Sequence, residues 1–156
     1  MIVFVPVDST ALAVLRGTVT DRVGFTATPA LRAGLELASD DEEEADFAAF
    51  TYAGVAALLD GTGARYVIAA DVPEPGVTPL PDDPFGRVAL AGPAWRQILA
   101  IYTDEVSALS AVARAREAVA GLSLADSWSH DTVERLRADH DLLWHLPDEL
   151  VPREQV

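Results

Sequence analysis

The sequence contains no cysteine, no lysine and no long apolar run. Without cysteine the chain can form neither disulfides nor thiolate metal sites, and it has no cysteine nucleophile. This composition suits a reducing compartment. No apolar run reaches the roughly 18 residues that a membrane-spanning helix needs, and the apolar start of the chain lacks the basic segment of a secretory signal. We therefore expect a cytoplasmic protein that does not act at a membrane.

Basic residues are scarce. The chain has 25 acidic residues against 11 basic ones, all of them arginine, and a formal net charge of −14. Such a charge repels phosphate backbones, and no cluster of arginines is dense enough to make a local exception, so nucleic acid is not an expected partner. A basic protein, or a second copy of this chain in a homodimer, remains as an expected partner.

The length and composition predict a single globular domain over residues 1–156. Half of the residues are hydrophobic, and a chain of this size buries roughly 68–70% of the surface exposed when it is unfolded. A core can therefore form without metals or disulfides.

Hydrophobic patterning predicts an α+β fold. Strands are expected at 2–7, 66–70, 88–91 and 97–102, the last two forming an antiparallel hairpin. Helices are expected after Asp8, from Thr28, over 40–60 and from Thr103 or Asp104 to about residue 120, whereas 18–26 and 72–86 are predicted as loops. Residues 123–150 fit a helix around Val133 to Leu143 or a last strand around 142–146, and the pattern does not decide. The order is β-α-α-α-β-β-β-α followed by this ambiguous end, in a single mixed sheet of about four to five short strands covered by helices.

The helix over 40–60 has the strongest local signals. Ser39 and Glu42 fit a capping box at its start. Phe47, Phe50, Gly54, Val55 and Leu58 recur along one face. The acidic run from Asp40 to Asp46 is typical of a solvated first helical turn and lacks the glycine and the ligand spacing of a calcium loop.

Three carboxylates follow predicted strands: Asp8, Asp71 and Asp104. In open sheets ligands gather at the carboxyl ends of strands, so these acids are weak catalytic candidates, with Mg²⁺ as a conceivable ligand. The simpler interpretation, which we favour, is that Asp8 and Asp104 cap helices and Asp71 opens a turn.

No other residues form a recognisable catalytic or cofactor motif. His140 and His145 are five residues apart, which suits two metal ligands neither on a helix nor on a strand, and His130 lies further away. There is no G-x-S-x-G elbow and no phosphate-binding loop, so we expect no cofactor and no metal, and the catalytic residues are unknown. Of the tryptophans, Trp144 is expected in the core, whereas Trp128 and, at a hairpin corner, Trp95 are candidates for an interaction surface.

Five segments of the chain resemble, in this order, a family of small acidic actinobacterial proteins: VPVDSTALAVL, FTATPALRAGLELASDDEEEADFAAFTYAGVAALL, RYVIAADVPEPGVTP, GRVALAGPAWRQILAIYTDE and HDLLWHLPDEL. The resemblance spans nearly the whole chain and is weakest over 123–137. The family is a domain of unknown function, so the resemblance supplies no activity and no site residues. It implies an actinobacterial, cytosolic origin, in agreement with the lysine-free composition.

Two functions follow from these observations. The first, which we favour, is a non-enzymatic interaction or regulatory domain, because no nucleophile, base and oxyanion donors converge in the sequence. The alternative is a small enzyme or ligand-binding protein that uses the three strand-end carboxylates.

Overall fold

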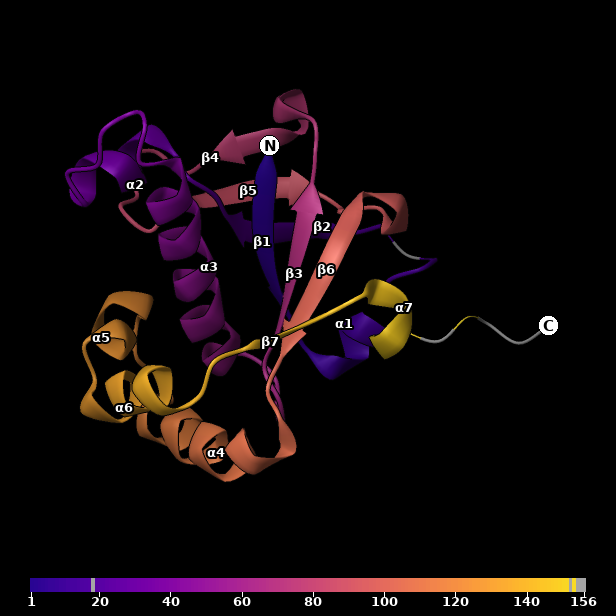
Figure 1. Ribbon diagram of the computed structural model, residues 1–156, viewed down its shortest axis with the longest axis vertical. Coiled ribbons are helices and arrows are strands. Elements are labelled where there is room, and N and C mark those ends of the chain that lie inside the picture. The colour runs from indigo at the N-terminus through magenta and orange to yellow at the C-terminus, as the bar shows by residue number, and fades with distance from the viewer. Residues whose placement is uncertain (18, 152, 154–156) are drawn as a thin grey trace.

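The chain folds around one seven-stranded sheet in the order β4-β5-β2-β1-β3-β6-β7. The computed structural model describes residues 1–17, 19–151 and 153. Figure 1 shows the long helix α3 lying across one face of the sheet, with α4, α5 and α6 grouped near its C-terminal end. Helices α1 and α7 lie together on the other side of the view from α3.

All seven strands pair antiparallel. They are β1 (Ile2–Val7), β2 (Asp21–Phe25), β3 (Tyr66–Asp71), β4 (Val77–Pro79), β5 (Arg87–Ala91), β6 (Ile98–Thr103) and β7 (Leu143–His145). The α+β class with one sheet is confirmed. The sheet is antiparallel rather than mixed, and it has more strands than the sequence predicted.

The α-helices are α1 (Ser9–Ala13), α2 (Pro29–Gly34), α3 (Glu42–Leu59), α4 (Leu109–Ala118), α5 (Leu124–Trp128), α6 (Asp131–Asp139) and α7 (Pro147–Leu150). Three short 3₁₀ turns, η1 (Glu74–Gly76), η2 (Trp95–Gln97) and η3 (Val106–Ala108), precede β4, β6 and α4. The region that pattern alone left open contains both alternatives, since a helix ends at Asp139 and a strand begins at Leu143.

The sheet is covered on both faces. Alternate residues of a strand point to opposite faces. In β1, Phe4 packs into the cluster beneath α3, whereas Val3 and Val5 pack into a second cluster that includes Leu12 of α1. Burial on both sides explains why β1 and β3 are continuous apolar runs in an antiparallel sheet.

Three of the sequence-based strand and loop assignments are wrong. Strands β5 and β6 form no hairpin, because β5 pairs with β2 and β4 while β6 pairs with β3 and β7. The predicted loop 18–26 contains β2. Glycine is required at position 24 of this strand, because a Cβ there would lie 2.5 Å from Cγ1 of Val3. The predicted loop 72–86 contains the edge strand β4, in which Pro79 is tolerated because an edge strand needs fewer ladder donors.

The helix starts were predicted with mixed success. Asp8 and Thr28 cap α1 and α2 through hydrogen bonds from the amides of Ala11 and Leu31, as predicted. The capping box at Ser39 is wrong, because α3 begins after Asp41, whose carboxylate instead accepts from the amide of Ala38. Asp104 caps no helix either, since the N-cap of η3 is Glu105.

Candidate functional site

The sheet register separates the three candidate carboxylates. Ile2 lies opposite Asp71, and Val7, which precedes Asp8, lies opposite Tyr66. Thr103, which precedes Asp104, also pairs with Tyr66. Asp8 and Asp104 thus flank the start of β3 while Asp71 lies at its end, roughly 17 Å along the strand. The structure does not bring the three acids to one edge.

Each of the three acids already has a local partner. Asp8 accepts the α1 cap at 2.7 Å, and Asp71 forms an exposed ion pair with the N-terminal ammonium at 3.0 Å. The interpretation of Asp8 as a cap is therefore confirmed, and the geometry gives no support to a shared magnesium site.

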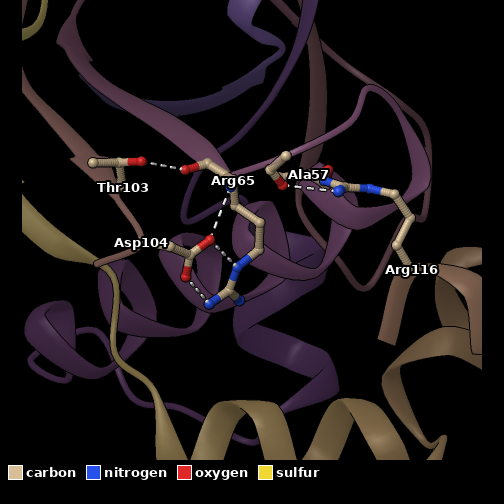
Figure 2. A network of polar contacts seen from close by, with 6 residues as sticks. Ala57, Arg65, Thr103, Asp104 and Arg116 are labelled. Carbon is tan, nitrogen blue, oxygen red and sulfur yellow. Dashed lines mark hydrogen bonds and ion pairs between the residues drawn. The ribbon is translucent and has the colours of Figure 1, made fainter. Parts of the chain in front are cut away.

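Asp104 instead forms a buried ion pair with Arg65. The two side chains are 0% and 3% exposed. Nη2 and Nε of Arg65 donate to the two carboxylate oxygens at 2.6 and 3.1 Å, and the Arg65 amide donates to Oδ2 at 2.8 Å (Figure 2). The Thr103 hydroxyl donates to the Arg65 carbonyl at 2.8 Å. This network fixes the entry to β3 against the end of β6.

Arg116 of α4 lies beside this pair and holds the end of α3. It donates to the carbonyls of Leu58 and Gly63 at 3.2 and 2.8 Å. It also donates to the carbonyl of Ala57 at 3.4 Å (Figure 2). These groups include C-terminal helix carbonyls that lack intrahelical donors. Burial lowers the pKa of Arg116, an effect opposed by the nearby charge of Asp104. Arg116 thus caps the C-terminal end of α3 with a side chain from another helix.

A cleft of about 820 Å³ lies between α3, α6 and the segment that leads to β7. One wall is the stripe Phe47, Phe50, Thr51 and Gly54 of α3. The remaining lining residues are Arg65, Glu134, Arg137, Ala138, His140, Asp141 and Leu142. Its size falls within the range of small-molecule sites. We call it the α3–α6 cleft.

The predicted apolar stripe of α3 divides into a buried part and an exposed part, since Val55 and Leu58 lie in the core. Phe47 is 68% exposed and lies outside the core. Phe50 packs against Phe4 and Tyr102, with ring centroids 5.6 and 4.6 Å apart. The buried face of α3 consists largely of small residues such as Ala45, Ala49 and Ala53. The sequence signal for an exposed part of the helix is that the bulky Phe47 lies apart from this alanine-rich face.

The two edges of the sheet differ in chemistry. Edge strand β4 contains Pro79, and Pro81 and two acids follow within four residues. Proline and charge are usual means of blocking edge pairing. Edge strand β7, Leu143–His145, has no proline within it, although Pro147, Asp148 and Glu149 follow within four residues, and its Trp144 is 55% exposed. Strand β7 thus differs from β4 in having a proline-free ladder and an exposed tryptophan.

Trp144 extends an aromatic row that starts in the α3–α6 cleft. It pairs across the strands with Tyr102, and directly paired residues point to the same face. Tyr102 contacts Phe50, which in turn lies 6.4 Å from Phe47 between ring centroids. The prediction that Trp144 lies in the core is wrong, because this residue of the edge strand β7 is 55% exposed.

The other two tryptophans are half-buried and stack against arginines. Arg137 lies 3.7 Å from the Trp128 ring centroid, and Tyr52 packs edge-on against the same ring. Arg16 lies 4.0 Å from the Trp95 ring centroid. Trp95 and Trp128 remain predictions as interaction residues, since no partner is present.

A family model described as a family of unknown function, DUF6912, matches residues 1–152. The chain belongs to this family. No curated protein and no solved structure matches the chain. Membership in DUF6912 confirms the expectation of a family of unknown function, and it assigns no activity to the α3–α6 cleft or to β7.

Within the described part of this DUF6912 chain, no group of three or more histidine, aspartate or glutamate residues is arranged to hold a metal ion. Nor does any helix over those residues combine the length and apolarity that crossing a bilayer requires. The geometry thus presents two features for function, the α3–α6 cleft and the edge strand β7.

Proposed function

We propose that this protein is a non-enzymatic interaction domain that binds an extended, basic segment of a partner protein along edge strand β7. The observation that carries the proposal is a proline-free edge strand in which Leu143 and Trp144 are exposed. Exposed edges pair with added strands, in which main-chain hydrogen bonds give affinity and alternate side chains give specificity.

The charges around β7 favour a basic partner. The acidic residues Asp139, Asp141, Asp148 and Glu149 flank the strand on both sides and are exposed. With a net charge of −14 on each chain, two copies meeting at this edge would repel each other, whereas a lysine- or arginine-rich segment would be attracted. A second copy is therefore the less favoured occupant.

The cellular setting belongs to the same proposal. We infer a cytoplasmic role in an actinobacterium, supported by the absence of cysteine and lysine from the sequence. A reducing compartment suits a chain that has no cysteine and therefore relies on packing rather than on disulfides.

A peptide selection tests the proposed function. Displayed random peptides would be selected against the wild-type chain, and the enriched sequences should alternate apolar with basic residues. Binding should be lost in Trp144→Ser and retained in Leu80→Ser, a matched change of an exposed apolar residue beside the opposite edge. Bound peptide should also slow amide exchange at residues 143–146.

Two outcomes would overturn the proposal. One is selected peptides that bind Trp144→Ser as tightly as wild type and protect amides elsewhere. The other is a stable homodimer in sedimentation that dissociates in Trp144→Ser, which would make a second copy the occupant of β7.

A further inference from the structure

The α3–α6 cleft contains nitrogen donors that the protein itself does not use. Arg65 is 3% exposed, and Asp104 occupies its Nε and Nη2. Its Nη1 makes no hydrogen bond within the described chain, although Arg65 lines the cleft. In Figure 2 this second terminal nitrogen points away from Asp104. A deeply buried guanidinium therefore keeps one edge unused.

Arg137 supplies a second cation at the same cleft. It forms no ion pair with any described residue, and its one hydrogen bond runs from Nη2 to the Trp128 carbonyl at 3.2 Å. Its Nε is buried without an acceptor, and so is Nδ1 of His140, which also lines the cleft. Buried polar atoms without partners are rare and often mark a ligand site.

The acidic residues of the lining are in a different situation. Glu134 and Asp141 are exposed, so water hydrates their oxygens. The buried atoms without a partner at this cleft are thus nitrogens, and Nε of Arg137 is a donor that needs an acceptor oxygen. Because acids lie at the rim and the chain is strongly negative, a singly charged carboxylate fits better than a doubly charged phosphate.

The rest of the lining suits an apolar tail. Phe47, Phe50 and Leu142 line the cleft, and Gly54 lets the Leu142 side chain approach α3 closely, because a Cβ there would lie 3.3 Å from Cδ1 of Leu142. From Phe47 to Gly54 the stripe extends about 10 Å along the helix. This is the length of a medium acyl chain or a bicyclic ring system.

From these observations we propose that the α3–α6 cleft binds an apolar monocarboxylate, with the carboxylate on Arg137 and the unused edge of Arg65 and the tail along Phe47, Phe50 and Leu142. The site is independent of the segment bound at β7, so either can fail without the other.

The test uses a panel of defined probes: decanoate, 3-phenylpropanoate and indole-3-acetate, each with its neutral primary amide. Binding is measured by calorimetry and by amide shifts of Gly54 and Leu142. Carboxylates should bind at least about tenfold more tightly than the amides, because charge-assisted hydrogen bonds are the stronger ones.

Variants on one helix provide the control. Arg137→Met should weaken carboxylate binding by about tenfold or more, whereas Arg135→Met, which removes the same charge from an exposed position of α6, should leave binding unchanged. Phe47→Ser should weaken decanoate more than 3-phenylpropanoate. Far-ultraviolet circular dichroism confirms that each variant is folded.

The proposal is overturned if no probe shifts the Gly54 and Leu142 amides at about 5 mM, a concentration that would reveal millimolar dissociation constants. It is also overturned if acids and amides bind equally, or if Arg135→Met weakens binding as much as Arg137→Met does.

Discussion

Arg65 and Asp104 lie 39 residues apart in the chain and form a two-pronged ion pair that is almost completely buried. Removing one partner would leave an uncompensated charge in the interior, which costs about 3–5 kcal/mol. Asp104→Asn should therefore reduce the free energy of unfolding by about that amount, measured by urea denaturation. The comparison is Asp71→Asn, in an exposed pair with the N-terminus, which should cost less than about 1 kcal/mol. Equal losses of unfolding free energy in the two variants would show that the buried pair stabilises the fold no more than the exposed pair does.

Arg116 should contribute to stability by capping α3 from outside. Arg116→Met removes a charged donor from the carbonyls of Leu58 and Gly63, and the expected loss is about 1.5–3 kcal/mol. Arg114→Met, at an exposed position of the same helix, should change the unfolding free energy by no more than about 0.5 kcal/mol. Thermal denaturation of both variants checks this, and similar melting temperatures would contradict it.

Two glycines with nearly the same backbone angle separate conformational strain from collision. Gly63 and Gly86 have φ of +74° and +73°, so alanine at either position costs about 1–2 kcal/mol of left-handed strain. A Cβ at Gly63 meets nothing, but at Gly86 it would lie 2.2 Å from the Thr26 carbonyl oxygen. Gly86→Ala should therefore be less stable than Gly63→Ala by more than about 2 kcal/mol in urea. Equal unfolding free energies of Gly86→Ala and Gly63→Ala would mean that the loop before β5 can shift to relieve the collision without a loss of stability.

Asp83 should make stability depend on acid pH. Burial alone would raise its pKa, but hydrogen bonds from the Arg87 side chain and the Phe85 amide prevail and lower the pKa below its ordinary value of 3.8. A lowered pKa in the folded state means that the stabilisation is complete above the unfolded-state pKa and is lost as pH falls through the folded-state value. Asp83→Asn should thus be less stable than wild type at neutral pH, and the difference should shrink below about pH 4. A difference that stays constant from neutral to acid pH would exclude this role.

Much of the fold could be predicted where local chemistry decides it. The buried runs of β1 and β3, the caps at Asp8 and Thr28 and the long helix α3 all follow from short-range patterns. Partner choice among strands could not be predicted in the same way. Strand β5 pairs with β2 rather than with its neighbour β6, and β2 was missed because Gly24, needed for close packing on Val3, is a residue that patterns assign to loops.

The candidate site was less predictable than the fold, because it depends on residues distant in sequence. From sequence alone Asp104 resembles a helix cap, because its ion pair with Arg65 becomes visible only in the folded chain. Arg137 and His140 become candidate site residues only because α6 packs near α3 and both residues line the cleft between them. Phe47 fitted the helical stripe, but periodicity does not distinguish a core-facing stripe from one that lines a cleft. Exposure of bulky residues is a tertiary property.

The tryptophans offer a direct comparison of core and surface. Trp128 contacts Tyr52 at 4.7 Å between ring centroids and supports Arg137, so Trp128→Ala should cost about 3 kcal/mol of unfolding free energy. Trp144 is 55% exposed on β7, so Trp144→Ala should cost less than about 1 kcal/mol. Acrylamide should quench the fluorescence of Trp144 more strongly than that of Trp128, measured in variants that retain one tryptophan at a time. A large loss of stability in Trp144→Ala would place this residue in the core and remove the main support for β7 as a binding edge.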